Sequence, residues 1–122
     1  ILVMAKASPY VRTTCKKYAA DIPDGQLIVN VAKGVEADTL MTMSQIIEEE
    51  VPGANVVVLS GPSHAEEVGR GLPTTIVVGA HDRESALYVQ NVFMSPVFRV
   101  YTSHWQPERR MVLATATIRK RL

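Results

Sequence analysis

Two segments place anion-binding groups where an apolar run ends. Lys33 follows the apolar residues 29–32 and precedes Gly34, and an ammonium group there can neutralise a phosphate or polarise a carbonyl. Gly61, Pro62 and Ser63 follow a second apolar run; the glycine lets an anion approach the backbone, and the helix expected after it offers unbonded N–H groups. A solvated loop lysine and a serine that only caps a helix are the structural alternatives, and both stay open here.

Other chemistries have less support. His64 could act as a general base, but it has no evident partner, and His81 and His104 are expected in surface loops. Cys15 is the single cysteine of the chain, so it forms no internal disulfide, and we interpret it as a packing residue. No metal-ligand spacing, no Gly-x-Ser-x-Gly nucleophile elbow and no complete dinucleotide-binding glycine motif occur.

Length and composition indicate one globular domain. The chain has 122 residues, of which 47% are hydrophobic and 20% charged. No apolar run approaches the roughly 20 residues that cross a bilayer, and residues 1–5 are too short for the core of a signal peptide. The expected compartment is therefore the cytoplasm.

The C-terminal residues 106–122 are strongly basic, with five arginines and lysines against one glutamate. A basic tail can bind nucleic acid or anionic lipid. No aromatic residues are interleaved in it and no nucleic-acid-binding fold is visible, so a solvated terminus is the favoured interpretation and nucleic acid is not an expected partner.

Apolar runs alternate with helical patterns along the chain. We expect strands at residues 1–5, 27–32, 56–60, 74–80 and 98–102, separated by helices that include residues 39–51, 63–71 and 82–93. This alternation predicts an α/β fold: a mostly parallel sheet of about five strands with helices on both faces. Ligand sites in such a sheet lie at the carboxyl ends of the strands, which again indicates Ser8, Lys33 and the segment after Ser60.

Three local expectations follow from the same patterns. Residues 1–5 should form a strand buried on both faces, although its edge, if unpaired, would favour self-association. Ser8 should cap the next helix, with Pro9 in its first turn. Leu40 should belong to the apolar stripe of helix 39–51, with residues 48–50 facing water.

Three separated blocks carry a family resemblance. They read Asn-Val-Ala-Lys-Gly-Val-Glu at 30–36, Leu-Ser-Gly-Pro-Ser-His-Ala-Glu-Glu-Val at 59–68 and Phe-Met-Ser-Pro-Val-Phe-Arg-Val-Tyr at 93–101. In order and spacing the chain resembles bacterial-type NAD(P)-dependent glycerol-3-phosphate dehydrogenases over residues 1–103. The resemblance implies that residues 1–103 are the C-terminal half of an NAD(P)-binding Rossmann domain, followed by a divergent basic tail at 104–122.

The resemblance also implies a function and its site residues. The family moves a hydride between NAD or NADP and C2 of sn-glycerol 3-phosphate or dihydroxyacetone phosphate, which supplies glycerophospholipid synthesis, and its full-length members are expected to be homodimers. Lys33 would contact both cofactor and substrate, Gly61 and Ser63 would bind the substrate, and Ala65 would lie against the cofactor. Residues that separate NADH from NADPH are expected upstream of Ile1.

The sequence departs from the family pattern in three places. The glycine-rich phosphate-binding turn would precede Ile1, and the Gly-Ala-Leu-Lys-Asn motif with the proton-transferring lysine is not found after Ser103; Lys120 has the wrong neighbours, so no catalytic residue is assigned. Residues 5–8 lack the usual Val-Pro before the serine. The expectation is a fragment that is inactive alone. The alternatives are another two-domain dehydrogenase of the hydroxyacid or ketopantoate type, and a non-catalytic nucleotide- or partner-binding module.

Overall fold

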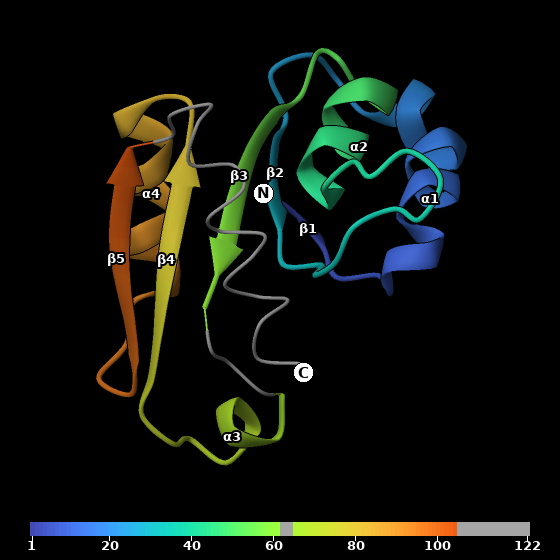
Figure 1. Cartoon of the computed structure of the whole chain (residues 1–122). Coiled ribbons are helices and arrows are strands. Elements are labelled where there is room, and N and C mark those ends of the chain that lie inside the picture. Colours follow the sequence, from blue (N-terminus) through green and yellow to red (C-terminus); the bar gives the residue numbers. More distant parts are fainter. Residues whose placement is uncertain (62–64, 105–122) are drawn as a thin grey trace. The chain divides into compact units, whose positions relative to one another are not determined.

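The computed structural model describes residues 1–61 and 65–104 (Figure 1). The elements in this part of the chain follow one another as β1 (Leu2–Met4), the 3-10 turn Ser8–Tyr10, α1 (Val11–Tyr18), the 3-10 turn Ala19–Asp21, β2 (Leu27–Asn30), α2 (Met43–Glu50), β3 (Asn55–Ser60), α3 (Ala65–Gly69), β4 (Thr74–Ala80), α4 (Arg83–Phe93) and β5 (Phe98–His104). The strands form a five-stranded sheet in the order β1-β2-β3-β4-β5. The chain divides into two compact units, Ile1–Val57 and Val58–Leu122.

The first unit is built on two parallel strands and two helices. β1 pairs in parallel with β2, so that Leu2 lies opposite Ile28 and Met4 opposite Asn30. α1 packs against α2 (Figure 1), and the apolar faces of this unit share one core, which consists of Met4, Val11, Cys15, Ile28, Met43, Ile46, Ile47, Val51 and Val56. The predicted packing role of Cys15 is thus confirmed.

The beginning of α2 differs from its prediction. The helix begins at Met43, after a capping box in which the Thr42 amide donates to Gln45 Oε1 at 2.9 Å and the Gln45 amide donates to Thr42 Oγ1 at 3.4 Å. Leu40 precedes the helix with a φ of 57° and is 76% exposed. Its predicted place on the apolar stripe was wrong because the chain makes a turn there, in which the Leu40 amide donates to the Glu36 carbonyl at 2.8 Å.

The burial predicted for residues 1–5 was also wrong. Met4 is buried, but the side chain of Val3 is 47% exposed, and β1 has a neighbouring strand on one side only within the described sheet. An apolar cavity of about 490 Å³ lies between β1 and α1, lined by residues that include Leu2, Cys15 and Tyr18. Self-association at this edge stays a prediction.

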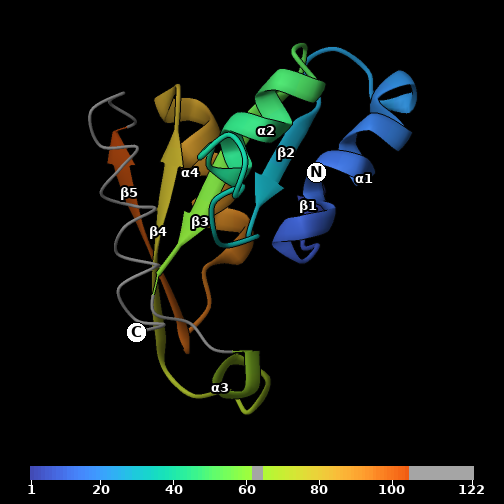
Figure 2. The ribbon, with the colours of Figure 1, turned by 45° about the vertical axis from the view of Figure 1, so that its right-hand side comes forward.

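The second unit contains a strand–helix–strand crossover. β4 and β5 pair in parallel from Thr74 opposite Phe98 to Ala80 opposite His104, and α4 between them packs on both strands (Figure 2). As predicted, Asp82 caps α4; its carboxylate accepts from the Ser85 amide at 2.8 Å. Ala86 and Val89 are the buried residues of this helix.

One strand pairing departs from a repeated crossover pattern. β3 and β4 are antiparallel, with Leu59 opposite Val78. The segment between these two strands contains the short helix α3, Ala65–Gly69. The starts of β2 and β3 meet where the Asn55 amide donates to the Gln26 carbonyl at 2.9 Å. The predicted α/β class with a mostly parallel sheet of five strands is confirmed.

Candidate functional site

The ends of β1 and β2 hold the turn that carries Lys33. The Val31 amide donates to the Met4 carbonyl at 3.1 Å, which ties the two strand ends together. One residue later the Ala32 amide donates to Asn30 Oδ1 at 3.0 Å. The Asn30 side chain is 2% exposed, so this buried amide oxygen fixes the backbone that leads into Lys33. Lys33 itself is partly buried.

Gly34 fits this turn because of its backbone conformation. Its φ is +116°, which residues with a Cβ rarely adopt. A Cβ placed on it would be in ordinary van der Waals contact with Ser8, at 3.4 Å from Ser8 Cβ and 3.5 Å from Ser8 Oγ. The residues that follow β1 and β2 therefore lie side by side, as the sequence predicted for the carboxyl ends of parallel strands.

Ser8 does not have its predicted capping role. It begins a 3-10 turn whose N-cap residue is Ala7, and that cap makes no side-chain hydrogen bond. α1 starts only at Val11, after Tyr10, again without a side-chain cap. The prediction was wrong because Ser8 is already inside the turn, and its side chain lies near Gly34.

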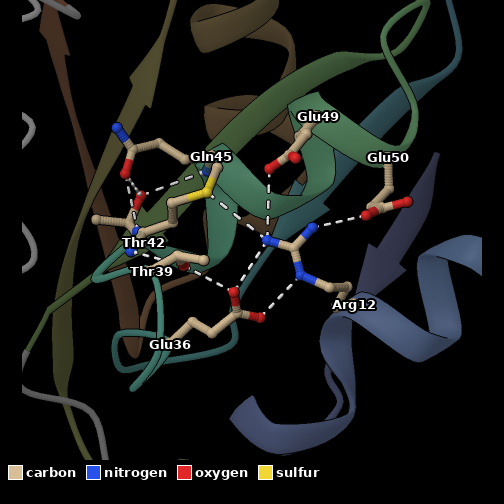
Figure 3. Close-up of polar contacts among 8 residues, drawn as sticks. Arg12, Glu36, Thr39, Thr42, Gln45, Glu49 and Glu50 are labelled. Atoms are coloured by element: carbon tan, nitrogen blue, oxygen red, sulfur yellow. Dashed lines mark hydrogen bonds and ion pairs between the residues drawn. The ribbon is translucent and has the colours of Figure 1, made fainter.

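Arg12 of α1 is the centre of a polar cluster that joins this turn to both helices (Figure 3). Its Nε donates to Glu36 Oε2 at 2.8 Å and its Nη2 to Glu36 Oε1 at 3.0 Å, a bidentate ion pair. Its Nη1 donates to Glu50 Oε1 at 2.6 Å, and Nη2 lies 3.4 Å from Glu49 Oε2. Glu50 thus contacts Arg12 and is largely shielded from water, which corrects the prediction that residues 48–50 face solvent.

The loop between Glu36 and α2 is closed by its own hydrogen bonds. The Glu36 amide donates to the Met41 carbonyl at 2.9 Å, and Val35 bridges to Thr42. Thr39 Oγ1 donates to Glu36 Oε1 at 2.7 Å (Figure 3). The Glu36 carboxylate consequently receives hydrogen bonds from α1 and from its own loop.

These contacts favour the charged forms of both partners. The hydrogen bonds from Arg12, and then from Thr39, lower the pKa of the Glu36 carboxyl. The carboxylates of Glu36 and then Glu50 raise the pKa of Arg12. Burial raises the pKa of the Cys15 thiol, which agrees with a packing role and not with a reactive thiolate.

Sequence reasoning missed the Arg12 cluster. The partners are far apart in the sequence: Arg12 and Glu36 are separated by 24 positions, and Arg12 and Glu50 by 38. No local sequence pattern therefore predicts either contact. The available signals were an arginine on the first turn of α1, a glutamate directly after the Lys-Gly-Val sequence, and the acidic end of α2.

Gly61 follows β3 in the second unit, where the backbone of β4 is close to it. A Cβ on Gly61 would lie 2.8 Å from the Thr75 carbonyl oxygen and 3.0 Å from Ile76 Cα. Packing alone therefore requires a glycine here, besides any ligand. Of the other predicted site residues in this segment, Ser63 and His64 lie outside the described residues, and Ala65 is the first residue of α3.

Two histidines among the described residues, His81 and His104, were predicted to lie in surface loops. His81 is exposed after β4, whereas His104 is the last residue of β5 and not the predicted loop residue.

Across residues 1–61 and 65–104, no group of three His, Cys, Asp or Glu side chains is placed to hold a metal ion. The same residues include no helix with the length and apolar character that crossing a membrane requires.

Comparison with known proteins gives consistent results. A family model described as the N-terminus of NAD-dependent glycerol-3-phosphate dehydrogenase matches residues 1–86. Glycerol-3-phosphate dehydrogenase [NAD(P)+] of Fusobacterium nucleatum is 61% identical over 105 residues, and that of Agathobacter rectalis is 56% identical over 103. Each alignment covers 84% of this chain and 31% of the relative, so the chain spans about a third of the length of these relatives.

Solved structures agree on the fold. The crystal structure of glycerol-3-phosphate dehydrogenase from Coxiella burnetii matches with a TM-score of 0.76 at 21% identity, over 83% of this chain and 31% of that one. The predicted Rossmann-type fold is thereby confirmed. With the family model matching more than two thirds of its residues, the chain belongs to the NAD-dependent glycerol-3-phosphate dehydrogenase family.

Proposed function

We propose that this chain supplies part of the substrate and cofactor site of an NAD(P)-dependent glycerol-3-phosphate dehydrogenase, whose reaction interconverts sn-glycerol 3-phosphate and dihydroxyacetone phosphate. The observation that carries the proposal is the turn after β2. There, a partly buried lysine at the carboxyl end of a parallel strand is followed by a glycine with positive φ that lies against Ser8. The family match over residues 1–86 includes this turn.

Each proposed site residue has a chemical role. Lys33 is proposed to contact both ligands. Its ammonium group can neutralise a phosphate or polarise the carbonyl at C2. Gly61 and Ser63 bind the substrate at the end of β3, and Ala65 lies against the cofactor. Lys33 follows β2, and the other three residues follow β3.

The turn after β2 fits an NAD or NADP ligand in one respect that the structure makes visible. Gly34 has no Cβ, which lets a ligand group approach its backbone closely, and the Ser8 side chain lies nearby. When bound, the nicotinamide gives or takes the hydride at C2. The work of this chain is to bind and orient the two ligands and to place positive charge beside them.

The proton transfer needs a group that these 122 residues do not contain in the family's sequence context. The Gly-Ala-Leu-Lys-Asn motif is not present in the chain. We therefore propose that the 122 residues bind glycerol 3-phosphate without turning it over. We also propose that residues 1–103 form the C-terminal half of the nucleotide-binding domain and that residues 104–122 form a basic tail. For the whole protein, we propose a cytoplasmic homodimer whose reaction supplies glycerophospholipid synthesis.

Calorimetric titration of the chain with glycerol 3-phosphate, with and without NADH, tests this function. Lys33→Met should weaken binding about tenfold to a hundredfold, which corresponds to the ~1.5–3 kcal/mol of a hydrogen bond to a charged group. Lys17→Met, an exposed lysine on α1, is the control of equal charge change and should leave the affinity within twofold. Equal losses in both variants, or none in either, would contradict the assignment of Lys33.

A spectrophotometric assay with NADH and dihydroxyacetone phosphate separates the remaining possibilities. Binding without turnover is the expected result. Turnover by the 122 residues would show that proton transfer does not need the family lysine. Absence of binding to either ligand would favour a module whose function is unrelated to this substrate.

A further inference from the structure

We propose that Arg12 is a positioning residue for Lys33, and that it acts through the bidentate ion pair with Glu36. This inference rests on the proposed function, because it takes Lys33 as the ligand-binding group. Arg12 lies on α1 and does not belong to the turn that carries Lys33. Its role would be to fix the loop that follows Lys33, and hence the point from which the ammonium group extends.

The contacts of Arg12 suit a guanidinium and no other side chain. Three of its nitrogen atoms are used: Nε and Nη2 by Glu36, Nη1 by Glu50, with Nη2 also 3.6 Å from Met41 Sδ. Figure 3 shows the loop residue Glu36 and the α2 residues Glu49 and Glu50 on different sides of this one planar group. A lysine at the same position could place one ammonium beside one carboxylate but could not span them.

The path from Arg12 to Lys33 is short and is anchored on both sides. On one side, the buried Asn30 side chain holds the Ala32 amide. On the other side, Gly34 lies against Ser8, and Glu36, two residues further on, is bound to Arg12. Because Lys33 lies between these anchors, releasing the Glu36 side chain removes the more distant one and leaves the segment after Gly34 to the backbone contacts of the loop itself.

The apolar core, and not this cluster, holds the two helices to their strands. Val11 and Cys15 of α1 and Ile46 and Ile47 of α2 are fully buried, whereas Arg12 is 21% exposed. Ion pairs near the surface contribute little to global stability. The specific consequence of the Arg12 bonds is therefore expected in the loop, since residues 37–40 are exposed and have no buried side chain of their own.

The positive charge of Arg12 is what allows three carboxylates to lie close together. The three carboxylates of Glu36, Glu49 and Glu50 converge on a single guanidinium. Without the guanidinium, like charges would face one another, and the loop that carries Glu36 is the part that can move away. Removing the charge of Glu36 instead releases the loop while Arg12 keeps its other two carboxylates.

The test combines a dynamic measurement with a binding measurement on the full 122-residue chain. In Glu36→Gln, the NMR order parameter of the Lys33 amide should fall from about 0.85 to below about 0.6, as a rigid turn becomes flexible. Exchange of the hydrogen-bonded Glu36 and Leu40 amides should accelerate at least tenfold. Glycerol 3-phosphate should bind several-fold more weakly. Glu84→Gln, an exposed glutamate on α4, is the control with the same charge change and should alter none of these.

A double substitution shows whether Glu36 acts through Lys33. In a Lys33→Met background, adding Glu36→Gln should change the affinity less than twofold, because the group that it positions is gone. In Arg12→Lys, the order parameter of the Lys33 amide should lie between the values of the wild-type chain and of Glu36→Gln, because a lysine can contact only one of the carboxylates. This conservative variant also tests Arg12 itself if larger substitutions there prevent folding.

The outcomes separate the positioning role from the function. An unchanged Lys33 order parameter in Glu36→Gln would overturn the proposal, as would an equal loss of affinity in the presence and absence of Lys33. If the wild-type chain binds no glycerol 3-phosphate, the proposed function fails, and the order parameter of Lys33 still decides whether Arg12 positions it.

Discussion

The loop after β2 and the segment after β3 both follow strands whose ends were predicted to bind a ligand, yet different forces fix them. The first, residues 33–42, is held by directed polar contacts: the Asn30 side chain, the Glu36–Arg12 ion pair and the Thr42 cap. The second begins at Gly61, which is held by steric fit against the backbone of β4. The first should therefore respond to changes of charge and hydrogen bonding, and the second to changes of volume.

The largest expected effect is at Gly61. Gly61→Val places branched carbon atoms where a single Cβ already lies 2.8 Å from a backbone oxygen, and should lower the free energy of unfolding by about 2–3 kcal/mol through overpacking. Urea denaturation measures this value. Gly69→Ala, where a Cβ meets nothing within 4 Å, should stay within about 0.5 kcal/mol of the wild-type chain. A tolerated valine at Gly61 would refute the steric explanation for this segment.

A smaller effect is expected at Asn30. Asn30→Ala removes the oxygen that accepts from the Ala32 amide in a buried setting, and should lower the free energy of unfolding by about 1–2 kcal/mol. Asn91→Ala, at an exposed position of α4, is the matched control and should have little effect. If the two substitutions cost the same, the polar contact at Asn30 does not hold the turn.

The two N-caps allow a direct comparison between the units. Thr42→Ala and Asp82→Ala each remove a side-chain acceptor at the start of a helix, and each should cost about 1 kcal/mol in thermal or chemical unfolding. Only Thr42→Ala should also accelerate hydrogen exchange in residues 36–41, because Thr42 ends the loop that holds Glu36. The same acceleration in Asp82→Ala would mean that exchange in this loop follows the global stability of the chain and not the Thr42 cap.

The smallest effect concerns pH. The pKa of Glu36 is lower in the folded chain than its ordinary value, chiefly because of the hydrogen bonds from Arg12. The stabilisation from this carboxylate is therefore present above the ordinary glutamate pKa of about 4.3, and is lost as the pH falls through the folded pKa. Exchange of the Leu40 amide, corrected for intrinsic rates, should accelerate in this acidic range. In Glu36→Gln that acceleration should be absent, and an identical pH profile would exclude Glu36 as its source.

Local patterns predicted the ends of β3 and β4 and came within two residues of the ends of β1, β2 and β5. Distant contacts account for most of what was missed. Lys33 and Gly34 could be placed because an apolar run followed by a glycine marks the end of a strand. Leu40 was misplaced because helical spacing continued through residues that form a turn with a positive φ. The antiparallel direction of β4 was missed because residues 63–71, between β3 and β4, have a helical pattern like that of a crossover. Arg12 was missed because its partners lie 24 and more positions away, where no spacing rule applies.

The different means of holding the two segments also bear on the site. A turn fixed by charge can be disturbed by a substitution on α1 that contacts no ligand, whereas a glycine fixed by steric fit should be disturbed only by changes in its immediate surroundings. Variation in the family at Arg12, Glu36 or Glu50 would thus be expected to affect ligand affinity through Lys33.

An NMR titration of the isotope-labelled chain with glycerol 3-phosphate, in the presence of NADH, examines the proposed site most directly. The amide resonances of Lys33, Gly34 and Gly61 should shift together and reach saturation at a common ligand concentration, and Lys33→Met should raise that concentration about tenfold to a hundredfold. Shifts confined to the basic residues 105–122, or no saturable shift at Lys33 and Gly61, would contradict the assignment of this site.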